Sequence, residues 1–277
     1  MNFVEDEVIE VDQKTKRVIT DKSQYSYDFL VIATGADTNY FGTVGAKEHC
    51  FTLKSLHDAI VLRNHILQTF EQAVETGNKD MLKVAIVGAG PTGVELAAEY
   101  AEYMHLLLKT YYTRSGFVES DIKISLVTAT PDIISQFPVK MRALALERLG
   151  KLGIKVVANA IVTKVEPYTL SFKDGSSLKA HTLVWVAGVA PTLSEIKGVA
   201  VGAKGRMEVD SALRSQNDTH TFALGDASGT FPMLAQIAVQ QSKVVADNIF
   251  ILATKSNKKP RSFDFKSKGL LISIGQW

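Results

Sequence analysis

Three glycines near the middle of the chain have the spacing of a dinucleotide-phosphate site. The apolar residues 84–87 run into the pattern G-x-G-x-x-G at residues 88–93, and a helix-forming stretch follows. The first glycine of such a turn permits the sharp bend, the second admits a pyrophosphate, and the third lets helix and strand pack closely. Free N–H groups at the helix N-terminus then face the anion. The predicted cofactor contacts are Gly88, Gly90, Pro91, Thr92 and Gly93. A glycine-rich turn in an ordinary α/β unit is the alternative.

Two side chains near this turn bear on which nucleotide binds. Glu95 lies one turn into the helix, where the partial positive charge of the helix N-terminus stabilises a carboxylate whatever its role. At the end of the following strand, an acidic residue usually binds the ribose 2′-hydroxyl, but this chain has Thr128 there. A threonine hydroxyl does not repel a 2′-phosphate. Thr128 therefore weakens the expected selectivity for NADH over NADPH. We keep NADH as the default ligand and leave tolerance of NADPH open.

The composition excludes several kinds of protein. The chain has 277 residues, 46% of them apolar and 22% charged, which is typical of a soluble globular protein. A net charge of +2 gives no basic field for nucleic acid, and the lysine-rich residues 255–261 are interpreted as a solvated loop or a weak lipid contact. No apolar run is long enough to cross a bilayer, and the acidic start is not a signal peptide.

The single cysteine excludes disulfide scaffolds, C-x-x-C redox chemistry and cysteine-based zinc sites. Cys50 is interpreted as a small apolar residue in a strand. The six histidines show no ligand spacing, and we expect no metal. Redox chemistry would therefore depend on a cofactor.

The elements that position the glycine turn follow from periodicity. Alternating and apolar runs predict strands at residues 3–11, 18–20 and 29–33, and a helix begins at Ser55 and ends at residues 76–78. After the turn we expect a helix over 93–112, a strand over 123–128, a helix over 139–152, a strand over 154–157, a hairpin turning at 173–176, and a strand over 182–188. This order predicts a βαβ nucleotide-binding core.

The remaining residues predict a buried strand at 221–225 that ends in Gly225-Asp226 and a helix over 235–252. Residues 263–274 are expected to start a hairpin whose partner strands are not in the chain.

Several segments occur in the order used by flavoproteins that bind two dinucleotides, in which an NAD domain interrupts an FAD domain. These segments are residues 33–35, 88–95, 187–189 and 221–226. Residues 235–241 further resemble the A-Q-x-A-x-Q-Q signature of type II NADH:quinone oxidoreductases, and residues 268–275 look like the start of that family's C-terminal region. The resemblance implies an α/β fold with a Rossmann-like NAD-binding domain inserted into a partial FAD-binding domain.

The resemblance divides the chain into five parts. These are a partial FAD-binding segment (1–54), a linking helix (55–78), the NAD(H)-binding domain (79–205), a second FAD-binding segment (206–262) and the start of a truncated C-terminal domain (263–277). Family members open with an FAD-binding G-x-G-x-x-G and finish with membrane-docking helices. We expect the chain to be a fragment lacking both, with the NAD(H) site nearly whole and about half of the FAD site.

The resemblance also assigns residues. The flavin and its surroundings would be contacted by Thr34, Gly35, Gly225, Asp226, Ala235 and Gln236. The nucleotide would be contacted by Glu95, Thr128, Gly188 and Val189. Catalytic roles fall to Glu95, which would orient the nicotinamide, and to Gln240 and Gln241, which would orient the quinone. Without the resemblance, Asp226 could cap a turn and the two glutamines could form a polar helix surface.

The implied function is hydride transfer from NADH to FAD and two-electron reduction of a membrane quinone without proton pumping. Such a respiratory-chain enzyme would lie peripherally on the cytoplasmic or organelle-matrix face of an energy-transducing membrane, docked through a C-terminal region, and a homodimer is left open. The alternatives are an NAD(H)-binding fragment without stable FAD and a related reductase of the superfamily that lacks redox cysteines.

Overall fold

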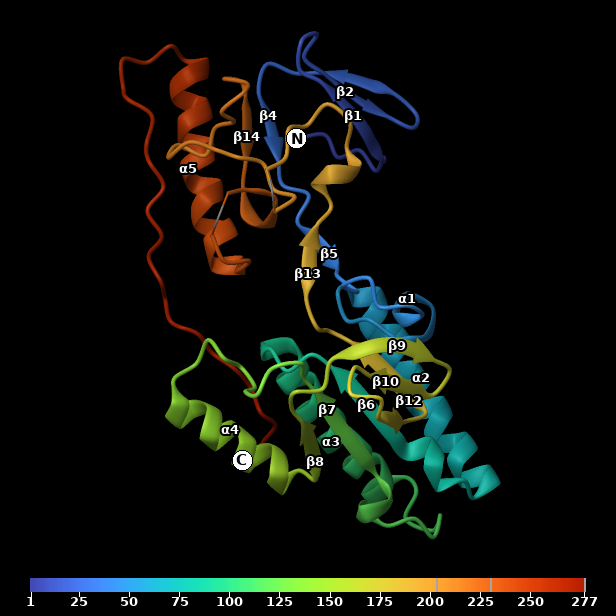
Figure 1. The fold of residues 1–277 in the computed structure, drawn as a ribbon. Coiled ribbons are helices and arrows are strands. Elements are labelled where there is room, and N and C mark those ends of the chain that lie inside the picture. Colours follow the sequence, from blue (N-terminus) through green and yellow to red (C-terminus); the bar gives the residue numbers. More distant parts are fainter. Residues whose placement is uncertain (203, 230, 277) are drawn as a thin grey trace. The chain divides into compact units, whose positions relative to one another are not determined.

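The computed structural model describes residues 1–202, 204–229 and 231–276. They form two compact units, each built around its own sheets (Figure 1). The split unit comprises Met1–Asp37 and Ala190–Leu270, and the inserted unit comprises Thr38–Val189 and residues 271–276. One unit is thus inserted into the other, as the sequence predicted. The unit boundaries fall at 37/38 and 189/190, whereas the sequence analysis ends the first FAD-binding segment at residue 54 and places the NAD(H)-binding domain at residues 79–205.

A four-stranded parallel sheet forms the centre of the inserted unit. Its strands, in spatial order, are β12 (Thr182–Trp185), β6 (Lys83–Val87), β7 (Lys123–Val127) and β8 (Ile154–Val157). Helix α3 (Pro91–Thr110) connects β6 to β7, and α4 (Val139–Lys151) connects β7 to β8. The strand order reverses at β6, so a crevice opens between the carboxyl ends of β6 and β12. The predicted Rossmann-like fold class is confirmed.

The two faces of this sheet are covered differently, because successive strand residues point to opposite sides. Val84 and Ile86 pack with α3, α4 and α2 (Leu56–Thr76), whereas Ala85 and Val87 pack on the other face. That second face is covered by α1 (Ala46–His49) and by an antiparallel sheet of β9 (Val162–Glu166), β10 (Thr169–Phe172) and β11 (Ser177–Lys179). Buried strands therefore hold the glycine turn at a fixed place.

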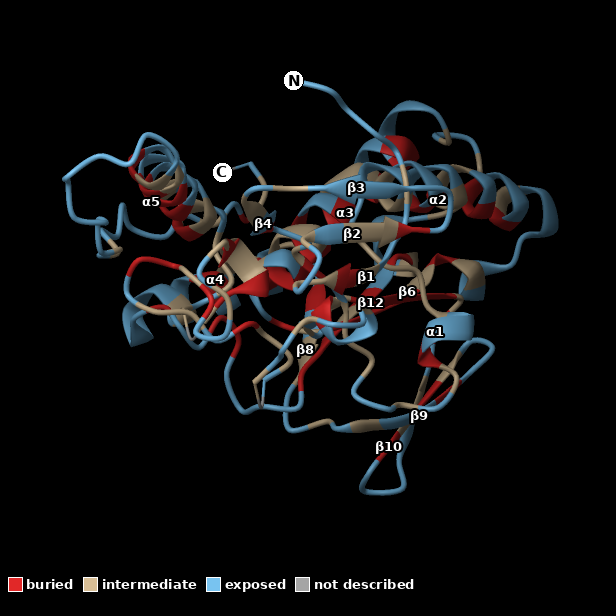
Figure 2. Ribbon diagram, turned by 90° about the horizontal axis from the view of Figure 1, so that it is seen from above, coloured by how far each residue is buried: buried red, intermediate tan, exposed pale blue. Residues whose placement is uncertain are grey.

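Helix α2 has the ends that the sequence predicted. The Ser55 hydroxyl accepts a hydrogen bond from the Asp58 N–H at 3.1 Å, and the Asp58 carboxylate accepts one from the Ser55 N–H at 2.9 Å. Gly77 ends the helix with φ +68°. Its buried stripe, which includes Leu62 and Phe70, is visible in red in Figure 2.

The split unit contains a meander and a two-stranded parallel sheet. The meander consists of β1 (Val8–Asp12), β2 (Arg17–Thr20) and β3 (Gln24–Ser26), and the parallel pair consists of β4 (Leu30–Ile32) and β14 (Thr221–Ala223). Phe222 of β14 packs with Val244 and Val245 of helix α5 (Ala235–Ala253). Where the chain passes between the units, β5 (Ala36–Thr38) pairs with β13 (Val189–Pro191). Short 3₁₀ helices lie at Lys79–Leu82, Glu119–Asp121, Leu193–Glu195 and Gly225–Ala227.

Three predictions about elements were wrong. The first strand begins at Val8 rather than at residue 3, and Phe3 is exposed. Cys50 follows helix α1 and is not in a strand; burial raises the pKa of its thiol to about 12. Residues 263–274 form no hairpin, because glutamine side chains of α5 bind part of their backbone instead of a partner strand.

Among the residues that the structure describes, no helix is both long and apolar enough to span a membrane. The same residues contain no group of three or more His, Cys, Asp or Glu side chains placed to hold a metal ion.

Candidate functional site

The first and third glycines of the turn are required by close backbone contacts. Gly88 has φ +115°, and a Cβ atom there would lie 2.5 Å from the Cα of Ala187. A Cβ on Gly93 would lie 1.7 Å from the carbonyl oxygen of Gly88. No side chain fits at either position, so strand β6, helix α3 and the segment after β12 are in direct backbone contact.

Gly90 serves a different purpose. A Cβ there would meet nothing within 4 Å, and the residue is exposed as the N-cap of α3. Pro91 occupies the first helical turn, where the missing N–H costs no hydrogen bond. The N-terminus of α3 is therefore open at Gly90, as a pyrophosphate site needs.

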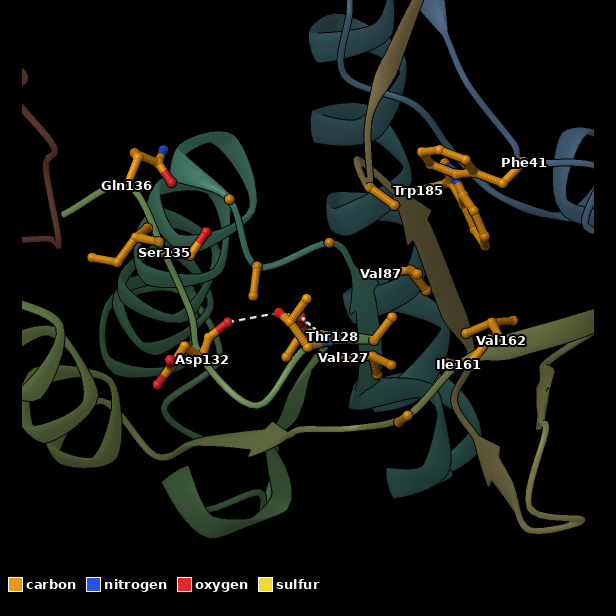
Figure 3. A pocket seen from close by; sticks show the side chains of 18 residues that line it. Phe41, Val87, Val127, Thr128, Asp132, Ser135, Gln136, Ile161, Val162 and Trp185 are labelled. Atoms are coloured by element: carbon orange, nitrogen blue, oxygen red, sulfur yellow. Dashed lines mark hydrogen bonds between the residues drawn. The ribbon is translucent and has the colours of Figure 1, made fainter. Parts of the chain in front are cut away.

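A first cavity of about 360 Å³ lies at the carboxyl ends of β6, β7 and β12, beside this turn. Gly88, Gly90 and Thr128, three of the predicted cofactor contacts, line it. Figure 3 shows Phe41 and Trp185 on one side, Asp132, Ser135 and Gln136 on the other, and Val87, Val127 and Thr128 between them. The loop after β7 is tied to the turn by the Ile134 N–H, which donates to the Ala89 carbonyl at 2.8 Å.

Thr128 is directed into its own loop. It is 7% exposed, and its hydroxyl lies 2.9 Å from that of Thr130. The carboxylate that lines this cavity belongs instead to Asp132, which is paired with the Arg142 guanidinium of α4. The end of β7 thus has one acidic side chain, and its charge is offset by an arginine.

A second cavity, of about 400 Å³, opens on the β12 side of the turn. Its walls include Pro91, Thr92, Gly188 and Val189, which were all predicted as cofactor contacts, together with Lys54. Gly90 and Ala187 line both cavities. The two cavities therefore lie on either side of the glycine turn.

Glu95 lies outside both cavities. Its carboxylate accepts a hydrogen bond from the backbone N–H of Ser273 at 3.1 Å, so in this structure it binds the C-terminal segment. Glu102, two turns further along α3, likewise accepts from the Gln276 N–H at 2.7 Å and pairs with Arg148.

Some of the residues predicted to contact the flavin lie close together in the split unit. Thr34-Gly35 and Gly225-Asp226 follow the carboxyl ends of the neighbouring parallel strands β4 and β14. Gly225 has φ +64°, and its N–H donates to the Gln241 side-chain oxygen at 2.6 Å. Gln241 is fully buried, and its Nε2 group has no hydrogen-bond partner among the described residues. A buried amide donor of this kind fits a site whose ligand supplies an acceptor.

The other polar residues of the signature face the C-terminal segment. Gln240 accepts from the Lys266 N–H at 3.1 Å and donates to the Lys266 carbonyl at 2.9 Å. One turn earlier, Gln236 accepts from the Lys268 N–H and donates to the Gly269 carbonyl. Ala235 is exposed at the start of α5. Two glutamines spaced by four residues thus bind one extended stretch of backbone.

Sequence reasoning missed Phe41, Asn39 and Asp132. The cavity includes Phe41 and Asp132, and Asn39 supports the loop that carries Phe41. Asp132 could have been found as the first acidic residue after β7. Nothing in the local pattern around Phe41 indicates a ligand contact, because the loop reaches the site only through tertiary structure.

A profile of the pyridine nucleotide-disulphide oxidoreductase family matches residues 1–242. A type II NADH:quinone oxidoreductase of Haemophilus influenzae is 32% identical over 91% of the chain, which spans 61% of that protein. A type II NADH:quinone oxidoreductase of Staphylococcus epidermidis is 30% identical over 99% of the chain and 70% of its own length. The chain therefore spans less than two thirds of the first of these relatives.

The fold is also found in a solved structure. NDH2 from Plasmodium falciparum, in complex with NADH, superposes with a TM-score of 0.88 over 99% of this chain and 74% of that chain, at 21% sequence identity. This likeness concerns the fold.

Proposed function

The chain belongs to the pyridine nucleotide-disulphide oxidoreductases and, within them, to the type II NADH:quinone oxidoreductases, and on this premise we propose that it transfers electrons from NADH through FAD to a quinone. The observation that carries the proposal is the pair of cavities that flank Gly90 at the carboxyl edge of the inserted sheet. The glycine turn would bind the pyrophosphate, Thr128 would lie near the adenosine ribose, and Gly188 and Val189 would help to seat the nucleotide.

The split unit contains some of the residues that would bind a flavin. Thr34, Gly35, Gly225 and Asp226 follow the carboxyl ends of the β4–β14 pair, and Gln241, which accepts from the Gly225 N–H, has an Nε2 group without a partner among the described residues. When bound, FAD would accept a hydride from NADH and pass two electrons to the acceptor. The residues of this chain would orient the two nucleotides and exclude water.

We keep Glu95, Gln240 and Gln241 as residues proposed to act in nicotinamide and quinone binding, with Ala235 and Gln236 on the same helix. In this structure Gln240 and Gln236 are bound to residues 266–269, so quinone access to their amides requires that segment to move. The quinone is proposed from the names of the relatives, and the absence of proton pumping and a membrane-peripheral location are proposed from the family resemblance of the sequence. A homodimer stays open.

The test is a spectrum and an assay on the purified chain. Bound FAD, seen as flavin absorbance, together with NADH-dependent reduction of a water-soluble quinone supports the enzyme. Colourless protein that still binds NADH supports the second candidate, a dinucleotide-binding chain without flavin. The reason to consider the latter is that the only G-x-G-x-x-G in the sequence is that of the inserted unit.

A further inference from the structure

Phe41 is a feature of the first cavity that the glycine turn does not explain. Phe41 is apolar and, as a whole residue, 65% exposed, yet it lines the cavity, beside Trp185 in Figure 3. Trp185, in contrast, is buried. An exposed aromatic ring at the wall of a ligand cavity is free to contact what enters it.

The backbone at Phe41 is held in an unfavourable conformation. Phe41 has φ +51° and Gly42 has φ +70°, and the Thr43 N–H donates to the Tyr40 carbonyl at 2.9 Å. Two central residues with positive φ are typical of a type I′ turn, which prefers Asn, Asp or Gly rather than a bulky residue. Glycine at this position would therefore be less strained than phenylalanine.

Asn39 fixes this turn to the carboxyl end of β12. Its side-chain oxygen accepts from the Phe41 N–H at 2.8 Å, and its own N–H donates to the Gly188 carbonyl at 3.0 Å. The Trp185 indole N–H donates to the Asn39 carbonyl at 2.9 Å. The Phe41 ring then lies so close to Gly188 that a Cβ there would be 2.9 Å from it. The ring is placed at the cavity by a network of contacts.

We propose that Phe41 is a contact residue for the bound dinucleotide, with its ring against the adenosine half. This inference rests on the proposed function. Phe41 lines the cavity of Thr128, which is the adenosine side of the turn, and does not line the cavity of Thr92 and Val189. The same cavity has the apolar side chains of Ile161 and Val162, which suit a purine ring.

The experiment compares the affinities of the whole chain for NADH and for ADP-ribose, measured by calorimetry. In Phe41→Gly we expect both dissociation constants to rise about tenfold, since base–aromatic stacking is lost. The unfolding midpoint should not fall, because glycine relieves the positive φ. Phe41→Tyr keeps the ring and should bind like the wild type. Val44→Ala is the matched control, because Val44 is an exposed apolar residue of the same loop that lies outside the cavity.

Unchanged dissociation constants in Phe41→Gly would overturn the inference while leaving the proposed function intact. Weaker binding of NADH with unchanged binding of ADP-ribose would overturn the placement at the adenosine half. A wild-type chain that binds neither ligand would overturn the proposed function, and this inference with it.

Discussion

Gly90 and Gly93 differ in what an added methyl group would meet, and the two roles of the turn can be separated on that basis. Alanine is favoured over glycine inside a helix by about 1 kcal/mol. At Gly93, however, the Cβ would be 1.7 Å from a carbonyl oxygen, and the clash outweighs the helix propensity. At Gly90, an added methyl group would have no protein atom within 4 Å.

We therefore expect Gly93→Ala to lower the free energy of unfolding by about 1–3 kcal/mol. Gly90→Ala should change it by less than about 1 kcal/mol and still weaken NADH binding at least about tenfold, because the methyl group occupies pyrophosphate space. Urea unfolding and calorimetry check the two quantities. Equal effects of both variants on stability would contradict this division.

The end of β7 provides a second prediction, on nucleotide choice. In Thr128→Glu, a carboxylate at the cavity should repel a 2′-phosphate, so the ratio of the NADPH to the NADH dissociation constant should rise at least about tenfold. Thr128→Gln has the same size without the charge and is the control. If Glu and Gln shift the ratio equally, the effect is steric and the electrostatic account is wrong.

At the scale of elements, α2 is joined to the sheet through a half-buried histidine, His65. The His65 Nε2 atom lies 2.8 Å from the Thr182 hydroxyl, and the ring packs 4.4 Å from that of Phe51. Burial, and then the nearby His181, lower the pKa of His65 to about 4. The folded protein thus holds this ring neutral at a pH where the unfolded chain is protonated.

It follows that stability should rise with pH across this window. The contribution of His65 is fully present above pH 6.5, its ordinary pKa, and is lost as the pH falls toward 4. His65→Gln, which cannot titrate, should reduce the loss of unfolding free energy between pH 7 and pH 5 by about 1 kcal/mol, allowing for partial exposure of the ring. Urea unfolding at both pH values measures it, and an unchanged pH dependence would contradict the assignment.

Helix α5 holds the extended residues 266–269 through Gln236 and Gln240. Replacing both glutamines by alanine should release this segment and speed tryptic cleavage after Lys266 and Lys268 several-fold, because proteolysis requires local opening. Val239→Ala, on the exposed face of the same helix, is the control. Cleavage at the wild-type rate in the double variant would show that the segment is held by other contacts.

These elements also show how far the sequence leads. The ends of α2, the glycine turn and the order of strands and helices in the inserted unit were predicted, because capping residues, glycines and periodicity act locally. The interpretation of residues 263–274 as a hairpin was wrong, since an alternating pattern does not reveal whether strands or side chains bind its backbone. Phe41 was missed for a similar reason. Its place depends on contacts of the loop of Asn39 and Phe41 with Gly188, which is far from that loop in the sequence.

At the scale of the whole molecule, the two compact units should respond separately to NADH. Ligand binding slows hydrogen exchange in the parts that it stabilises. We expect slower exchange of backbone amides at residues 88–94 and 128–136 when NADH is added, and little change in β14 and the Gly225 turn until FAD is present. Hydrogen exchange followed by mass spectrometry checks this. Protection confined to the split unit would contradict the placement of the NADH site in the inserted unit.

A calorimetric titration of the chain with NADH tests most directly whether the inserted unit holds this nucleotide. We expect saturable binding of about one NADH per chain, which Gly90→Ala weakens without unfolding the protein. An absence of binding by a folded wild-type chain, or binding that Gly90→Ala leaves unchanged, would contradict the assignment of the site.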